Sequence, residues 1–328
     1  MIVRWGLIGC GDIAAKRVAA ALGSAPNSSL VAVARRRADL AAEFAARHGA
    51  KRWHADWRDL VRDTDLDAVY IATPVNLHAE QTIAATEAGK HVLCEKPMAL
   101  TPSECERMLA AARAHGVRLG VAYYRHHYPI VTRLRELMAS GALGQPVVAV
   151  VQAFEMFDPA PDHPRAWFLK KEIAGGGPMF DFGCHRIEVL LELLGPIRTV
   201  HGFPATVRFQ NRDVEDTCTA HLDFESGAQA TLIVSHAAQE PRDSFDIYCT
   251  QGSAHVEVLN KGDLRLVAQS GLRQERHPAP LNLHLPLVQD FVDAIREGRE
   301  PAVTGEIGLA VARVVDAIYS AALSAYHR

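Results

Sequence analysis

Short apolar runs alternate with helical stretches through the first third of the chain, and this alternation limits the folds open to it. The runs read IVRWGLIGC, LVAVAR, DAVYIAT, HVLCE and VRLGVAY. The helix expected after HVLCE begins with an N-cap, an N1 proline and a capping-box acid, Thr101, Pro102 and Glu104. Continuous apolar runs are typical of strands buried on both faces. The pattern predicts an α/β fold with a doubly wound parallel sheet.

After Ala122 the alternation gives way to a succession of strands. The runs TCTAHLDF, AQATLIVSH, FDIYCT, AHVEVL and LRLVAQ follow one another with turn residues between them. This hairpin-like order predicts a large antiparallel or mixed sheet in an α/β region that ends with two helices. We therefore expect two domains, residues 1–122 and residues 123–328.

Composition excludes several classes of protein. The net charge is −3 over 328 residues, which is unlike the basic footprint of a nucleic-acid-binding protein. No apolar run reaches the roughly 18 residues of a membrane span, and the first residues do not resemble a secretory signal. The six cysteines are scattered without a C-x-x-C pair, which favours a reducing compartment over a disulfide framework. We expect a cytoplasmic protein that binds neither nucleic acid nor membrane.

The stretch GLIGCGDIA ends the first expected strand and opens a helix. In that setting Gly9 permits a tight turn, Gly11 lets the backbone approach a pyrophosphate, and Ala14 allows close helix packing. Free N–H groups and the helix dipole favour an anion there. We interpret the stretch as a nucleotide-binding turn that includes Asp12 and Ile13. The alternative is a glycine turn between two packed elements.

The end of the second expected strand indicates which nucleotide binds. An NAD site usually has an acidic residue there, bonded to the ribose 2′-hydroxyl. This chain instead reads VAVARRRADL, with Arg35, Arg36 and Arg37 at that position. Guanidinium groups suit a 2′-phosphate through charge-assisted, bidentate bonds. We predict NADP, with NAD possible and with Arg35 and Arg36 as ligands. A solvated basic turn is the alternative.

The motifs ATPVNLH and EKP follow two later strands. Ligands of open α/β sheets bind outside the carboxyl ends of strands, so the residues of these motifs are expected around one crevice. They are Thr73, Pro74, Asn76, His78, Glu95 and Lys96. Near a cationic nicotinamide ring, a lysine can have a lowered pKa and move protons. The alternative for Lys96 is an ordinary surface lysine in a loop.

The motif GGGPMFDFGCHRIEVLLELLG predicts a helix with Asp181 and His185 on one face. A carboxylate beside an imidazole holds its tautomer and raises its basicity, so this pair could take a hydroxyl proton while hydride leaves carbon. Glu188 and Glu192 continue the same stripe, which also fits the solvated side of an amphipathic helix. A metal site is disfavoured because no third ligand is spaced to join the pair.

Together these motifs resemble the family of glucose–fructose oxidoreductase and inositol 2-dehydrogenase, Gfo/Idh/MocA. The likeness lies in GLIGCGDIA, VYIATPVNLHAEQTIAATEAGKHVLCEKPMAL, GGGPMFDFGCH and FVDAIREGREPAVTGEIGLAVARVVDAIYSAA, and it spans essentially the whole chain. It implies an N-terminal Rossmann domain and a C-terminal α/β domain with an open-faced sheet, through which members often form dimers or tetramers. It further implies an NAD(P)-dependent dehydrogenase or reductase that acts on a secondary alcohol or ketone of a sugar, cyclitol or polyol.

The resemblance also implies roles for individual residues. His185 corresponds to the general acid/base, Asp181 to its orienting carboxylate, and Lys96 to the lysine that binds the reacting hydroxyl. The loop RAWFLKKEIAGGG resembles a segment that borders the nicotinamide in some members. Trp167 fits that segment, but Phe168 stands where the resemblance would allow an arginine.

The expected substrate residues depart from the family pattern. Many members read NRRF after the sixth strand, whereas this chain reads YYRHHYP, so Tyr124 and Arg125 are expected at the substrate. His284, in NLHLP, is a further candidate, although a lone histidine is more often structural. Two other functions remain open on the same fold, a non-catalytic NAD(P)-sensing regulator and an NAD-dependent glycosidase.

Overall fold

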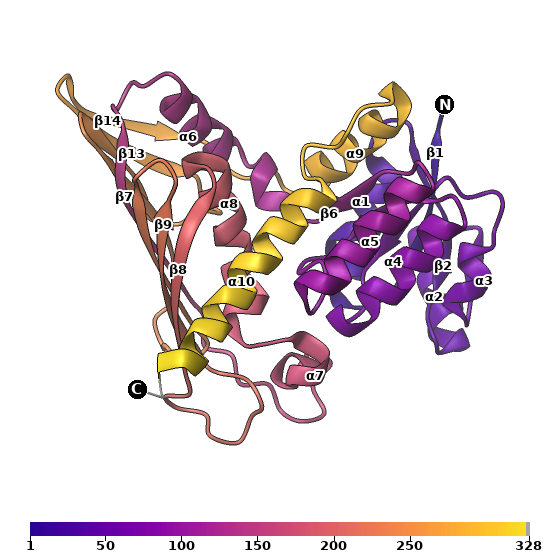
Figure 1. The fold of residues 1–328 in the computed structure, drawn as a ribbon. Coiled ribbons are helices and arrows are strands. Elements are labelled where there is room, and N and C mark those ends of the chain that lie inside the picture. Colours follow the sequence, from indigo (N-terminus) through magenta and orange to yellow (C-terminus); the bar gives the residue numbers. More distant parts are fainter. Residues whose placement is uncertain (326–328) are drawn as a thin grey trace. The chain divides into compact units, whose positions relative to one another are not determined.

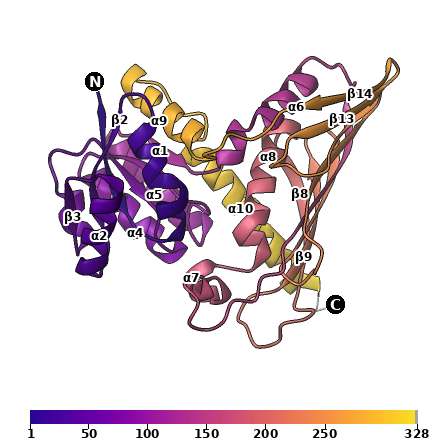
Figure 2. The ribbon, with the colours of Figure 1, turned by 180° about the vertical axis from the view of Figure 1, so that it is seen from behind.

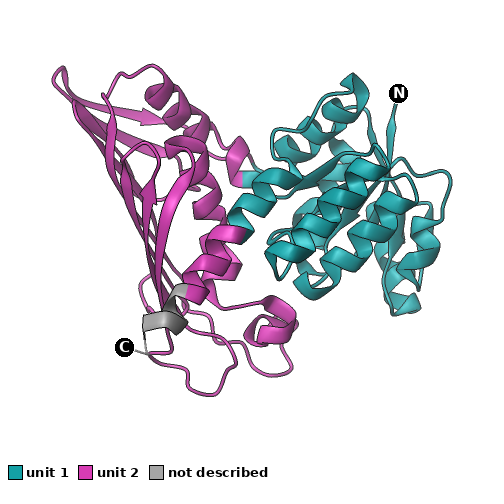
Figure 3. Ribbon diagram, viewed as in Figure 1, with its two compact units in different colours: residues 1–124, 281–312 teal, residues 125–280, 313–328 magenta. Residues whose placement is uncertain are grey.

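The computed structural model describes residues 1–325, which divide into two compact units (Figure 3). Unit 1 comprises residues 1–124 and 281–312, and unit 2 comprises residues 125–280 and those from 313 onward. The long C-terminal helix, α10 (Gly305–Ala325), begins in unit 1 and ends in unit 2. Within the described residues no helix is both long enough and apolar enough to cross a membrane.

The return of residues 281–312 to unit 1 was not anticipated by the sequence-based division after Ala122. Phe291 is fully buried and packs against the Trp5 ring, with the two ring centroids 5.7 Å apart. Gly120 and Thr304 also form an isolated antiparallel bridge. These contacts join segments far apart in sequence, so strand–helix alternation could not reveal them.

Unit 1 is built on a six-stranded sheet in the order β3-β2-β1-β4-β5-β6, and every neighbouring pair is parallel. The strands are β1 (Val3–Ile8), β2 (Ser28–Ala34), β3 (Arg52–His54), β4 (Ala68–Ile71), β5 (His91–Cys94) and β6 (Leu119–Val121). The helices are α1 (Ala19–Ser24), α2 (Ala38–His48), α3 (Trp57–Val61), α4 (His78–Glu87), α5 (Pro102–Ala114) and α9 (Leu285–Glu297), and they cover both faces (Figures 1 and 2). The prediction of a doubly wound parallel sheet is confirmed.

Local chemistry explains where these elements begin. All four residues of β4 are buried, as the apolar run predicted. Helix α5 starts with the expected capping box, in which the Thr101 hydroxyl accepts from the Glu104 amide and the Glu104 carboxylate accepts from the Thr101 amide. A π-helical turn, Ala14–Val18, precedes α1 and follows the glycine motif directly. These signals are local, which is why the sequence displays them.

Unit 2 contains an eight-stranded sheet in the order β14-β13-β12-β11-β7-β10-β9-β8. The pair β7–β10 is parallel and the other pairs are antiparallel, which confirms the expected mostly antiparallel sheet. Its strands are β7 (Pro146–Phe154), β8 (Ile197–Ala205), β9 (Thr217–Phe224), β10 (Gln229–Ser235), β11 (Arg242–Cys249), β12 (Gly252–Val256), β13 (Asp263–Ala268) and β14 (Gly271–Arg276). Strands β8 and β14 were missed because both are largely polar or exposed along their length.

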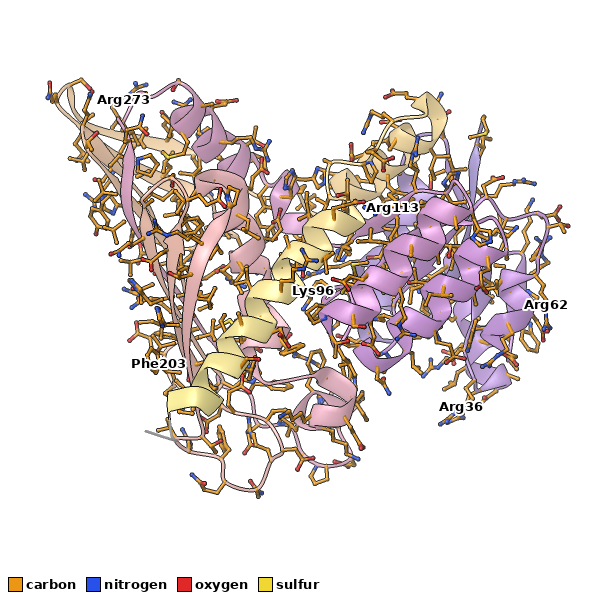
Figure 4. The ribbon with its side chains drawn as sticks, viewed as in Figure 1. Arg36, Arg62, Lys96, Arg113, Phe203 and Arg273 are labelled. Atoms are coloured by element: carbon orange, nitrogen blue, oxygen red, sulfur yellow. The ribbon has the colours of Figure 1, made fainter. Side chains whose placement is uncertain are left out.

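One face of this sheet carries the helices of unit 2. They are α6 (Pro129–Ala139), α8 (Cys184–Leu194) and the end of α10, whereas α7 (Lys171–Ala174) lies in the long loop between β7 and α8. Figures 1 and 2 both show the opposite face without a helix. Phe203 is 62% exposed there and is labelled in Figure 4, and Tyr248 and Leu272 are further exposed apolar residues of the sheet. The open-faced sheet expected from the family resemblance is therefore present.

Candidate active site

The glycine turn after β1 has the shape that a phosphate site requires. Gly9 has φ +94°, and a Cβ there would lie 2.6 Å from the backbone carbonyl of Ala72, so only glycine fits. A Cβ on Gly11 would meet no atom within 4 Å, which leaves space for a ligand beside the turn. Asp12 is exposed and its carboxylate pairs with Lys16 at 2.9 Å. The turn fits the pyrophosphate of a dinucleotide.

The three arginines after β2 are not equivalent. Arg37 is engaged with Asp39 at 2.5 Å. Burial raises the pKa of the Cys10 thiol to about 12, and the positive charge of Arg35 acts against this rise. Because Cys10 lies in the glycine turn, the Arg35 guanidinium must be near that turn. Arg36 is exposed, points into solvent in Figure 4, and makes no side-chain hydrogen bond or ion pair in the described part of the chain. Arg35 and Arg36 therefore remain the candidates for an anionic ligand.

A hydrogen-bonded carboxylate follows β5. Glu95 is buried and accepts a bond from the Tyr70 hydroxyl at 2.8 Å, from His284 Nε2 at 3.2 Å and from the Lys96 amide at 3.2 Å. Burial by itself raises the pKa of Glu95, but the His284 bond and the charge of Lys96 lower it below its ordinary value. A fixed anion thus adjoins the half-buried Lys96, whose peptide bond to Pro97 is cis.

His78 ties the ends of β4 and β5 together. Its Nδ1 lies 2.9 Å from the Pro97 carbonyl and its Nε2 lies 2.9 Å from the Thr73 carbonyl. Burial lowers the pKa of His78, so the neutral ring donates to one carbonyl at a time. The Thr73 hydroxyl is engaged with Gln81 at 2.7 Å. His78 and Thr73 hold the two loops in place.

Other residues assigned to the cofactor or substrate have varied surroundings in unit 1. Ile13 and Pro74 are half-buried, and Asn76 is exposed. Tyr124 is buried, and its ring centroid lies 4.7 Å from that of His284. His284 is fully buried behind Glu95, so it supports that carboxylate.

In unit 2, Asp181 and His185 occupy successive turns of one helical stretch. Asp181 belongs to a π-helical turn (Met179–Gly183) that runs into α8, where His185 is 1% exposed. Asp181 Oδ2 lies 3.4 Å from His236 Nε2 and 3.7 Å from an Arg165 guanidinium nitrogen. Neither His236 nor Arg165 was singled out from the sequence. The available signal for His236 was its place directly after the apolar strand β10.

The polar stripe on α8 is buried, which excludes the solvated-face alternative. Glu188 is 1% exposed and accepts a bond from His126 Nδ1 at 2.7 Å. Burial raises the pKa of Glu188, and His126 only partly offsets this effect. Glu192 forms an ion pair with Arg135. Periodicity identified the stripe correctly but could not identify the elements that cover it.

The GGG segment before Asp181 is anchored by another buried carboxyl group. Glu215 accepts bonds from the Gly177 amide at 3.0 Å and from the Tyr319 hydroxyl at 2.5 Å. A Cβ on Gly177 would lie 2.0 Å from the Glu215 carbonyl oxygen, so the approach requires glycine. Burial raises the pKa of Glu215 despite these bonds. The start of the helix is thereby fixed from β9 and α10.

The loop that carries Trp167 contains a cation at an unexpected position. Trp167 and Phe168 are stacked, with their ring centroids 3.9 Å apart. The Arg165 guanidinium lies 4.4 Å from the Phe157 ring centroid and 5.1 Å from that of Phe168. Arg165 therefore places a guanidinium against both of these phenylalanine rings. Arg125 is buried in a short 3-10 turn, Tyr124–His127.

Comparison with known proteins identifies the class to which this fold and these residues belong. Residues 3–123 match an oxidoreductase family with an NAD-binding Rossmann fold, and residues 131–255 match a Gfo/Idh/MocA C-terminal domain. The chain is 32% identical to 1,5-anhydro-D-fructose reductase of Ensifer adhaerens, over 93% of this chain and 92% of the relative. The protein is an oxidoreductase of the kind that acts on CH–OH groups.

Solved structures agree over nearly the full length. Levoglucosan dehydrogenase, in complex with NADH and levoglucosan, has a TM-score of 0.90 and 28% identity, covering 99% of this chain and 98% of that chain. Aldose–aldose oxidoreductase from Caulobacter crescentus, complexed with glycerol, has a TM-score of 0.91 and 27% identity with the same coverage. The chain belongs to the Gfo/Idh/MocA family of sugar oxidoreductases.

Proposed function

We propose that this protein transfers a hydride between NADP(H) and a secondary alcohol or ketone of a sugar, cyclitol or related polyol. The observation that carries the proposal is Lys96 at the end of β5, next to a Glu95 carboxylate that three donors hold. Similarity to enzymes named for anhydrofructose, levoglucosan and aldoses supports a sugar-like substrate.

Unit 1 is the proposed nucleotide-binding domain. The turn at Gly9 and Gly11 has room for the pyrophosphate, and Arg35 and Arg36 have the charge to bind a 2′-phosphate. The surroundings of Arg36 support NADP over NAD because no acidic side chain pairs with it in the described part of the chain. When bound, the nicotinamide supplies or accepts the hydride.

Three side chains share the proposed chemistry. Lys96 donates a hydrogen bond to the reacting oxygen and stabilises the negative charge that develops on it. In the oxidising direction, His185 accepts the hydroxyl proton as the carbon loses its hydride, and it returns the proton in reduction. Asp181 orients the His185 imidazole and stabilises its charged form.

Unit 2 is the proposed substrate-binding and assembly domain. Tyr124 is the last residue of the first segment of unit 1 and Arg125 is the first residue of unit 2, and both are proposed to bind the substrate. Trp167 is proposed to lie beside the nicotinamide. The helix-free face of the eight-stranded sheet, with Phe203, Tyr248 and Leu272 exposed, supports a homodimer or homotetramer formed through that face. Size-exclusion chromatography with light scattering tests this assembly.

A substrate screen tests the proposed reaction. Aldoses, inositols, ketoses and diols are incubated with NADP⁺ or NAD⁺, or with the reduced forms, while absorbance is followed at 340 nm. We expect turnover of at least one polyol or sugar with NADP(H). Absence of turnover across the panel, with nucleotide binding intact, contradicts the proposal and favours a nucleotide-sensing regulator.

Fluorescence titration with NADPH and NADH tests the choice of cofactor. Arg36→Ala is expected to weaken NADPH binding about tenfold and to leave NADH binding unchanged, because one charge-assisted phosphate contact is lost. Arg62→Ala is the matched control, since Arg62 is also an exposed arginine of unit 1 (Figure 4). Equal loss for both nucleotides contradicts the assignment of Arg36.

A further inference from the structure

We propose that His236 is a positioning residue that holds the Asp181 carboxylate through its Nε2 atom. The inference rests on the proposed function, in which Asp181 orients the general acid/base. His236 directly follows strand β10, whereas Asp181 belongs to the π-helical turn before α8. The contact therefore links the helix of the proposed catalytic pair to the sheet beneath it.

The backbone of His236 is fixed on both sides. Its amide donates to the Asp216 carbonyl at 2.7 Å, and its carbonyl accepts from the Phe157 amide at 3.0 Å. These bonds place the residue between the start of β9 and the segment that follows β7. The two hydrogen bonds fix the position of the His236 backbone, and with it the point from which the imidazole side chain extends toward Asp181.

The imidazole ring is also held in place by its neighbours. His236 is 1% exposed and lies between two phenylalanines, with centroid distances of 5.0 Å to Phe157 and 5.1 Å to Phe182. Phe182 directly follows Asp181, so the ring packs against the same helical turn whose carboxylate it faces. The aromatic contacts set the orientation of the ring and leave its nitrogens to polar partners.

Asp181 is the one carboxylate within ion-pair distance of this ring in the described part of the chain. Nε2 lies 3.4 Å from Asp181 Oδ2, and neither ring nitrogen makes a conventional hydrogen bond to any other described group. Buried polar atoms nearly always have a partner, and an N–H to carboxylate bond is about 2.8 Å long. A shift of about half an ångström completes the bond, and catalytic contacts commonly tighten when ligands bind.

Two further charged groups act on this contact. Arg165 approaches the same Oδ2 atom at 3.7 Å from the loop after β7. Burial raises the pKa of Glu215 and the charge of His236 acts against this rise, which indicates that Glu215 also lies near the ring. After the loss of His236, the Arg165 guanidinium is still 3.7 Å from Oδ2, which is farther than the 3.4 Å of His236 Nε2.

Paired substitutions separate positioning from packing. His236→Phe keeps an aromatic ring between Phe157 and Phe182 but removes Nε2, whereas His236→Gln keeps an N–H donor at similar reach. We expect kcat to fall about 10- to 100-fold in His236→Phe, as is usual for outer partners of functional groups, with nucleotide affinity unchanged. His236→Gln is expected to recover most of this loss. We also expect the acid limb of the pH–rate profile to move to higher pH in His236→Phe.

A kcat within twofold of wild type in His236→Phe overturns the proposal. Equal losses in the Phe and Gln variants, without a change in the pH–rate profile, overturn it as well because they indicate packing alone. Thermal melting of both variants shows whether either has lost its fold.

An NMR measurement of the His236 ring tests its contact with Asp181 without requiring that the protein turn over a substrate. The His236 Cε1–H resonance, assigned by its absence in His236→Phe, is recorded by NMR at one pH in wild type and in Asp181→Asn. We expect the chemical shift of this resonance to change in Asp181→Asn, because the carboxylate that faces the ring is removed. Asp158→Asn is the matched control, since Asp158 is exposed and pairs with Arg212.

An unchanged His236 chemical shift in Asp181→Asn refutes the contact whether or not any sugar is turned over. A changed chemical shift in a protein that turns over no sugar supports the contact and refutes the proposed reaction. The failure of one proposal can therefore be distinguished from the failure of the other.

Discussion

Glu95 in unit 1 and Glu215 in unit 2 are both buried and both accept a hydrogen bond from a tyrosine hydroxyl, yet their pKa values are shifted in opposite directions. For Glu95, burial is outweighed by His284, Tyr70 and the charge of Lys96, so its pKa is lowered. For Glu215, burial outweighs the bonds from Tyr319 and Gly177, so its pKa is raised. The comparison teaches that adjacent cationic and hydrogen-bonding groups, and not burial alone, decide in which direction the pKa of a buried carboxyl group is shifted.

The two regions use their carboxyl groups for different ends. In unit 1 an ionised Glu95 lies at the end of a parallel strand, next to the lysine proposed to bind the reacting oxygen. In unit 2 the buried Glu215 and Glu188 fix the two ends of the stretch that bears Asp181 and His185. Glu95 therefore places a negative charge next to Lys96, whereas Glu215 and Glu188 hold the helical stretch that bears Asp181 and His185.

The largest effect is expected from Lys96→Met, which removes the cation that Glu95 adjoins. We expect kcat to fall about 10³-fold, because the group proposed to stabilise the charge on the reacting oxygen is lost. NADPH affinity, measured by fluorescence titration, should stay within about twofold because the proposed phosphate contacts are made by other residues. Lys51→Met, at an exposed lysine of unit 1, is the control. A near-normal kcat in Lys96→Met would contradict the claim that the charged pair of Glu95 and Lys96 in unit 1 serves the reaction.

A smaller effect is expected at the buried pair of unit 2. His126→Ala should lower the free energy of unfolding by about 3 kcal/mol, because it leaves Glu188 buried without its partner. Adding Glu188→Gln should recover much of that loss, since the amide needs no counter-charge. Urea unfolding of the two single variants and the double variant measures the coupling. Additive losses would mean that Glu188 and His126 do not act as a pair.

The smallest effect concerns the pH dependence of stability at Glu95. The pKa of Glu95 in the folded protein is below the ordinary value of 4.5. The Glu95 carboxylate therefore makes its full contribution to the free energy of unfolding above pH 4.5, and this contribution is lost as the pH falls through the folded pKa. Between pH 6 and acid conditions of about pH 3, we expect stability to fall less steeply in Glu95→Gln than in wild type, by about 1 kcal/mol. Urea midpoints across this range provide the measurement.

Glu215→Gln should act in the opposite sense. Because the pKa of Glu215 is raised in the folded protein, this group stabilises the fold below pH 4.5, and its contribution to the free energy of unfolding is lost as the pH rises through the folded pKa. Relative to wild type, Glu215→Gln should therefore gain about 1 kcal/mol of stability as pH rises from 4 to 8. Curves of the same sign for the Glu95 and Glu215 variants would break the comparison between the two units.

Much of the architecture was predictable because its signals are local. The buried strand β4, the capping box of α5 and the tight turn at Gly9 each depend on residues within a few positions of one another in the sequence. The polar edge strand β14 was not predictable, because its place in the sheet comes from pairing with β13 and not from its own apolar pattern.

The sequence by itself determined the alternation of strands and helices in the first third of the chain, the glycine turn and the shared helical face of Asp181 and His185. Only the tertiary structure decided that this face is buried, that His284 supports Glu95 from 189 residues away, and that His236 meets Asp181. The physical reason is that periodicity specifies which side chains share a face, whereas the charge and partners of a buried group depend on the elements that pack against it.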